Sequence, residues 1–174
     1  MRWFLSAGLL ALWCVGAVAQ ESPTPEQSRQ DGVDQRGDHV MGFSHDKTTH
    51  HFHLLKDGGE IMVTANDPKD KKSIDQIQMH MSHLVGMFSN GNFKAPMMIH
   101  GSNPPGVATM IRLKSDIRYT VSEIPQGAVM RIETSSPETT DAVHAFLLFQ
   151  IIDHKTGDSP AIGESKSDSS LSSE

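Results

Sequence analysis

The sequence predicts a small α+β domain built from two similar units, and three observations support this prediction. Two pairs of short segments rich in β-branched and aromatic residues are each joined by a turn that contains glycine, as in β-hairpins. Each pair precedes a longer segment bounded by a helix N-cap residue and a glycine. These segments share a stretch of equal length from Asp to Gly, residues 75–91 and 141–157. We therefore predict duplicated β-hairpin–helix units that form one antiparallel sheet of about four strands, with two helices on one face.

Both ends of the chain are predicted to lie outside this domain. Residues 1–19 combine an early arginine, an uncharged apolar run and a small-residue cleavage site, the features of a signal peptide. Residues 20–38 and 158–174 are dominated by polar residues, glycine and proline, which is typical of disordered segments. The prediction is therefore a disordered linker, a single domain over residues 39–157 and a disordered polar tail. The protein should be exported, periplasmic or secreted, with no stable membrane span after signal cleavage.

The first predicted hairpin covers residues 49–65. Its turn is Asp57-Gly58-Gly59, where glycine permits the positive φ angles of a tight hairpin. Side chains alternate between the two faces of a strand, so His50 should share the apolar face, while His51 and His53 take the other.

A helix should follow, with Asp70 or Ser73 as its N-cap and an end at Gly91. A stripe at intervals of three and four predicts its buried face. The stripe consists of Ile74, Ile77, Met81, Leu84, Val85 and Phe88. A second stripe beside it brings His80 and His83 next to each other.

The second unit repeats this order after a connection over residues 93–106. We predict that the connection is a short strand or turn ending at His100, followed by a rigid proline-rich loop. A hairpin over residues 117–134 then leads to a helix that begins at Ser136-Pro137 and ends at Gly157. This helix is apolar nearly all round, which indicates burial on more than one side. Either a homodimer forms through it, or the first helix and the connection cover it.

Composition and motifs exclude several classes of function. The net charge of −6 and the absence of a Lys/Arg cluster argue against nucleic-acid binding. The single cysteine, Cys14, lies in the predicted signal peptide, so the mature chain should have no disulfide, thiolate metal site or cysteine nucleophile. Ser44-His45-Asp46 cannot form a catalytic triad because consecutive side chains point in different directions. His-Glu-x-x-His, a phosphate-binding glycine loop and a nucleophile elbow are all missing from the sequence.

The histidines are the main functional signal. The chain has ten, and neutral imidazole is a good ligand for copper and zinc. The predicted metal ligands are His45, His50, His51, His53, His80, His83, His100 and His144. The favoured combination joins His45, His50 and His51 to His80 or His83, although two separate histidine groups are equally compatible with the sequence. The alternative is that the histidines form a polar, exposed strand face.

Three segments carry a resemblance to known proteins. They are Met41-Gly42-Phe43-Ser44-His45, Lys47-Thr48-Thr49-His50-His51-Phe52 and Phe149-Gln150-Ile151-Ile152-Asp153-His154. They resemble segments of a small group of uncharacterised exported bacterial proteins, over most of residues 40–158. Some members of that group are labelled aspartate carbamoyltransferase, but this chain is far shorter than such an enzyme and lacks its Ser-Thr-Arg-Thr phosphate-binding motif.

The sequence therefore favours an exported, histidine-rich protein that binds copper or zinc to sequester or deliver the ion, without catalysis of its own. One alternative is a small metal-dependent hydrolase or oxidase, in which an open coordination position activates water or oxygen. The other is a non-catalytic interaction module that dimerises through its second helix.

Overall fold

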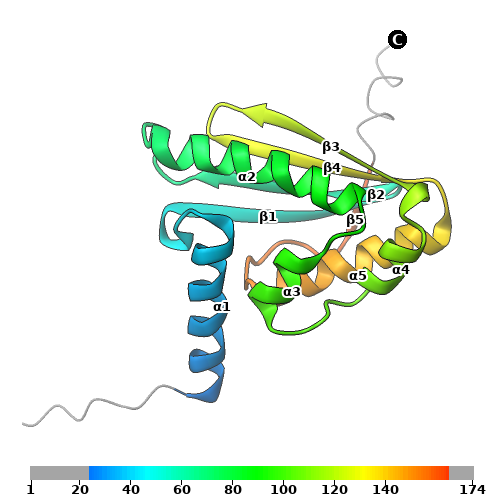
Figure 1. The fold of residues 1–174 in the computed structure, drawn as a ribbon, viewed down its shortest axis with the longest axis horizontal. Coiled ribbons are helices and arrows are strands. Elements are labelled where there is room, and N and C mark those ends of the chain that lie inside the picture. The colour runs from blue at the N-terminus through cyan, green and yellow to red at the C-terminus, as the bar shows by residue number, and fades with distance from the viewer. Residues whose placement is uncertain (1–23, 165–174) are drawn as a thin grey trace, which may run out of the picture.

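The computed structural model describes residues 24–164, which form one layer of β-sheet and one layer of helices (Figure 1). The α+β class is therefore confirmed. The predicted signal peptide, residues 1–19, lies outside the described residues. Within residues 24–164, no helix has the length and apolar character needed to cross a membrane.

The sheet has five strands in the order β3-β4-β2-β1-β5. β1 (Thr48–Leu55) and β2 (Gly58–Ala65) form one antiparallel hairpin, and β3 (Ile117–Ile124) and β4 (Gly127–Thr134) form the other. β2 and β4 join the two hairpins, again antiparallel. The short strand β5 (Ile162–Gly163) pairs with β1 in parallel. The prediction of about four antiparallel strands is therefore corrected to a mixed sheet of five, because the C-terminal segment adds a parallel edge.

Glycines allow the two hairpins to lie close together. The first turn is Lys56-Asp57, and Gly58, with a φ of 135°, already belongs to β2. A Cβ atom on Gly58 would lie 2.1 Å from the carbonyl oxygen of Ile132 in β4. The two hairpins each precede a long helix, as predicted, but this order does not establish a duplication, which stays a prediction.

The two long helices begin where their capping residues predict. Before α2 (Lys71–Ser89), the Asp70 side chain accepts a hydrogen bond from the Ser73 amide. Before α5 (Pro137–Asp153), the Ser136 hydroxyl accepts one from the Thr139 amide. Both helices contact the same face of the sheet and close the main core. That core includes Phe52, Ile61, Val63, Ile77, Met81, Met130, Ile132, Phe146 and Leu147.

The connection between the units is helical, not the predicted strand or turn. It contains α3 (Lys94–His100), and Pro96 lies in the first turn of this helix, where its missing N–H is not needed. After the proline-rich loop comes α4 (Val107–Arg112). Gly106, just before α4, has a φ of 81°, and a Cβ atom there would lie 2.0 Å from the Ala142 carbonyl oxygen. This glycine therefore lets α4 approach α5. Two short 3₁₀ helices, η1 (His45–Lys47) and η2 (Lys114–Asp116), precede β1 and β3.

Part of the predicted linker forms helix α1 (Pro25–Met41) instead. Thr24 caps this helix and Pro25 occupies its first position, both favourable for helix initiation. Val33 and Gly37 are buried, and α1 contacts α3 while projecting from one end of the domain (Figure 1). Composition predicts disorder here because the segment has few apolar residues, whereas packing against α3 stabilises it. Residues 20–23 lie outside the described residues.

The predicted C-terminal tail is also ordered in its first part. Within residues 158–164, Ile162–Gly163 form β5 beside β1, and the Lys56 amide donates to the Gly163 carbonyl. Residues 165–174 lie outside the described part of the chain.

α5 is covered within the same chain. The sheet packs against one side of it and α4 against another. Phe149 meets the His100 ring of α3 edge-on, with 4.9 Å between ring centroids. Ile152, in contrast, is 70% exposed. The all-round apolar character of α5 is thus largely explained by α3, α4 and the sheet, and a homodimer through α5 stays a prediction.

Candidate functional site

The structure divides the central histidines between the two faces of β1. We call His50, His80, His100 and His154 the inner cluster, because they lie on the helix-covered side. We call His51 and His53 the outer pair, because they point to the face that no long helix covers. The predicted alternation along β1 is confirmed: Phe52 and Leu54 are buried on the inner side, whereas His53 is exposed.

Stacked rings connect the inner cluster. His50 and His154 are parallel, with 5.7 Å between centroids and 5° between planes. His154 meets His100 edge-on at 5.0 Å. On the other side, Phe43 stacks with His50 at 6.0 Å and meets His80 edge-on at 5.5 Å. The inner cluster thus joins β1, α2, α3 and the end of α5.

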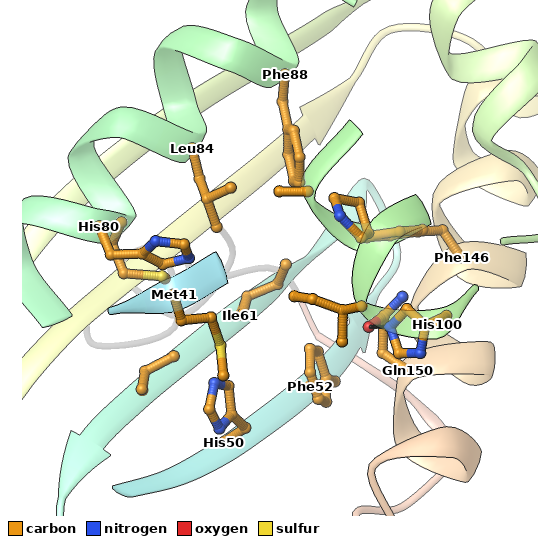
Figure 2. A pocket seen from close by; sticks show the side chains of 15 residues that line it. Met41, His50, Phe52, Ile61, His80, Leu84, Phe88, His100, Phe146 and Gln150 are labelled. Atoms are coloured by element: carbon orange, nitrogen blue, oxygen red, sulfur yellow. Dashed lines mark hydrogen bonds between the residues drawn. The ribbon is translucent and has the colours of Figure 1, made fainter. Parts of the chain in front are cut away.

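A cavity of about 60 Å³ lies beside these rings. His50 and His80 line one end, and His100 and Gln150 line the other (Figure 2). Most of the wall is apolar, formed by Phe52, Ile61, Leu84, Phe88 and Phe146 among others. Figure 2 also shows the Met41 side chain, from the end of α1, reaching toward the His50 ring below His80.

Burial keeps three inner histidines uncharged. It lowers the pKa of His50 to about 3, with further contributions from His154, His80 and His51. Burial, assisted by His83, lowers the pKa of His80 to about 4. Burial and His100 lower the pKa of His154 to about 4, although Asp153 and Asp34 act in the opposite direction. These imidazoles are neutral at pH 7, the form that ligates metals.

His100 connects three helices through the hydrogen bonds of its ring and of Asp153. Its side chain is only 1% exposed, its Nδ1 lies 2.5 Å from Asp153 Oδ2, and its Nε2 lies 2.9 Å from Gln150 Oε1. Arg29 of α1 donates to the other Asp153 oxygen at 2.5 Å. Burial raises the pKa of Asp153, but the bonds from His100 and Arg29 outweigh it and the net pKa is lowered. With both ring nitrogens engaged, His100 links α1, α3 and α5 and is poorly placed to bind a metal.

The outer pair is oriented by a carboxylate from the C-terminal segment. His51 Nδ1 lies 2.8 Å from Asp158 Oδ1, and the other carboxylate oxygen accepts hydrogen bonds from the Phe52 amide and the Thr156 hydroxyl. Burial raises the pKa of Asp158, but the bonds from His51, Thr156 and Phe52 outweigh it, so the pKa is lowered. The His53 ring is parallel to that of His51 at 6.2 Å. A bond from Nδ1–H to Asp158 leaves His51 Nε2 as the ring's electron-pair donor.

The chain has no match among protein-family models, curated proteins or solved structures. Its function must therefore be inferred from the chemistry of these residues.

The favoured four-histidine combination does not form. His50 and His51 point to opposite faces, because they are consecutive residues of one strand. His45 Nδ1 is held 2.9 Å from Asp38; burial lowers the pKa of His45, but Asp38, with Asp34 and Asp46, outweighs it and raises the pKa. Across residues 24–164, no three His, Cys, Asp or Glu side chains lie together as a metal site.

The other predicted ligands lie apart from both groups or are engaged. His83 is exposed on α2. His144 lies on α5 and donates from Nε2 to the Leu55 carbonyl at 2.8 Å, so this ring nitrogen is engaged. Among the predicted ligands, His50, His80 and His100 line one cavity, and His45 and His50 line a second one together with Asp34 and His154.

Two functional residues escape prediction from the sequence. His154 lies four residues after buried Gln150, so helical spacing could have placed it on the buried side of α5. Asp158 offers no such signal, because it reaches His51 through a contact between distant parts of the chain.

Proposed function

We propose that this protein is an exported metal-binding protein that holds copper or zinc through histidines, in order to sequester or deliver the ion. The observation that carries the proposal is the outer pair with Asp158 on the Nδ1 atom of His51. In metal sites, a carboxylate on one ring nitrogen fixes the tautomer of the ligating histidine and makes the other nitrogen more basic. Asp158 is suited to this role toward His51.

The geometry of the outer pair suits an exchangeable ion. His51 and His53 occupy alternate positions of β1, so both rings project from one face. Their parallel rings are 6.2 Å apart, and the exposed His53 can lean toward the anchored His51 to bring both nitrogens to about 2 Å from one ion. Water or a group from another molecule would complete the coordination. A site with only two protein ligands favours transfer of the ion over permanent retention.

The test is metal titration by calorimetry on the mature chain without a polyhistidine tag. Zn(II) and Cu(II) should bind, and the double variant H51A/H53A should weaken binding by about 100-fold. The matched control H39A/H83A removes two exposed histidines that belong to neither group. This variant should bind both ions as the wild type does. Affinity no better than millimolar for both ions in the wild type would refute the proposed function. Equal losses in the two double variants would refute the assigned site.

A further inference from the structure

A second set of possible ligands lies inside the domain and differs in chemistry from the outer pair. Met41 at the end of α1, His50 in β1 and His80 in α2 line the same end of the cavity. In Figure 2, Met41 extends toward His50, with His80 above it. A thioether and two imidazoles from three separate elements therefore line the same end of the cavity.

The rings of His50 and His80 are held in place by packing. Phe43 contacts both, stacking on His50 and meeting the edge of His80. Met41 is partly buried against the core. Because methionine has three rotatable side-chain bonds and a polarisable sulfur, Met41 can adjust to an ion that enters between the more rigid rings.

The cavity favours an ion of low charge that sheds its water easily. Its volume of about 60 Å³ leaves room for an ion but for few waters, since one water needs about 10–15 Å³. The wall around Met41 is mostly apolar and contains no carboxylate. Burying a divalent cation there would cost its hydration without an opposing charge. A soft monovalent ion bound by thioether and imidazole avoids most of that cost.

We propose that Met41, His50 and His80 form a Cu(I) site at this end of the cavity, separate from the outer pair. The inference rests on the proposed function in assigning metal binding to this protein, but it requires neither His51 nor His53.

Competition with the chromophoric Cu(I) chelator bicinchoninate, under anaerobic reducing conditions, measures the affinity. M41L removes the sulfur but nearly conserves the volume, so the domain should stay folded. We expect M41L to weaken Cu(I) binding tenfold or more and to leave Zn(II) binding unchanged. The matched control M79L removes a sulfur that is 58% exposed on α2 and should bind Cu(I) as the wild type does. H51A/H53A should lose Zn(II) but keep Cu(I) within twofold.

Methyl NMR of protein labelled with ¹³C-methyl methionine supplies a direct readout. One equivalent of Ag(I), a diamagnetic analogue of Cu(I), should shift the Met41 methyl signal and the ring signals of His50 and His80. Cu(I) affinity unchanged in M41L, or a shift confined to other methionines, would overturn this inference and leave the proposed function standing. Zn(II) and Cu(II) affinities unchanged in H51A/H53A, with Cu(I) affinity still reduced in M41L, would overturn the assigned outer site alone.

Discussion

His50 and His51 are neighbours in the sequence but have opposite chemical environments. His50 lies among aromatic rings and its pKa is lowered to about 3 by burial. His51 lies on the other face of β1, where Asp158 accepts a hydrogen bond from its ring. A dense run of histidines on a strand is therefore divided by alternation into two groups, and each group must be assessed with the neighbours that the fold supplies.

The neighbours also determine which ions each face suits. The inner face offers neutral imidazoles, a thioether and an apolar cavity. The outer face offers an exposed imidazole, a carboxylate-oriented one and access to water. A soft ion that tolerates dehydration fits the first, and a divalent ion that keeps some water ligands fits the second.

The largest difference between the faces should appear in acid. The pKa values of His50, His80 and His154 are about 3, 4 and 4 in the folded chain, below the ordinary value of 6.5. At a pH between the folded and the ordinary pKa values, the unfolded chain binds more protons than the folded chain. The free energy of unfolding therefore falls as the pH is lowered from about 6.5 to 4. Each group contributes up to about 1.4 kcal/mol per pH unit, and the total reaches several kcal/mol.

Urea unfolding of the metal-free protein with a chelator, at pH 7, 6 and 5, measures this effect. H154L removes one of the three groups and should reduce the pH dependence by about one third. H53A, on the outer face, should leave it unchanged because that ring is exposed. An equal pH dependence of the unfolding free energy in wild type and H154L would show that His154 does not contribute to it.

The two His–Asp pairs provide the next comparison. Asp153 forms ion pairs with the buried His100 and with the partly exposed Arg29, whereas Asp158 pairs with His51, which is more exposed than His100. D153A leaves His100 buried without its carboxylate and should cost about 3–5 kcal/mol of unfolding free energy. D158A should cost about 1–2 kcal/mol, because the His51 ring can bond to water instead. Thermal and urea unfolding of both variants measures these losses, and equal losses would contradict the assigned difference.

The sequence predicted those parts of the fold that rest on local signals. Alternation and glycine turns placed both hairpins, and Asp70 and Ser136 marked the starts of α2 and α5. The helices α1 and α3 were missed because, beyond the start signal at Thr24 and Pro25, they are stabilised by tertiary contacts, including the Arg29–Asp153–His100 connection through α5. Local patterns carry no information about such contacts.

The site was predicted in the same partial way. The sequence placed the histidine run on a strand, and its alternation assigned the histidines to the two faces of β1, as the structure has them. It could not supply the partners: His154 and Asp158 come from the end of the chain, more than a hundred residues after β1 begins. His45, expected among the ligands, is instead held by Asp38 of a helix that composition did not predict.

The smallest effect separates orientation from ligation on the outer face. D158N keeps the size of the side chain and one oxygen that can accept the His51 Nδ1–H bond, but it removes the negative charge, and its NH2 group then faces the Phe52 amide and the Thr156 hydroxyl, which donate to a carboxylate oxygen in the wild type. Zn(II) affinity should therefore fall by about tenfold, less than the loss in H51A/H53A, while Cu(I) affinity is unchanged. Calorimetry for Zn(II) and chelator competition for Cu(I) measure both values. Asp158 also accepts a hydrogen bond from the Phe52 amide of the same strand, so it can act by holding β1 as well as through its charge. T156A serves as the control, because loss of the Thr156 hydroxyl loosens Asp158 without changing its charge. A loss in T156A as large as that in D158N would mean that Asp158 acts by holding β1 in place, and not through its charge on His51.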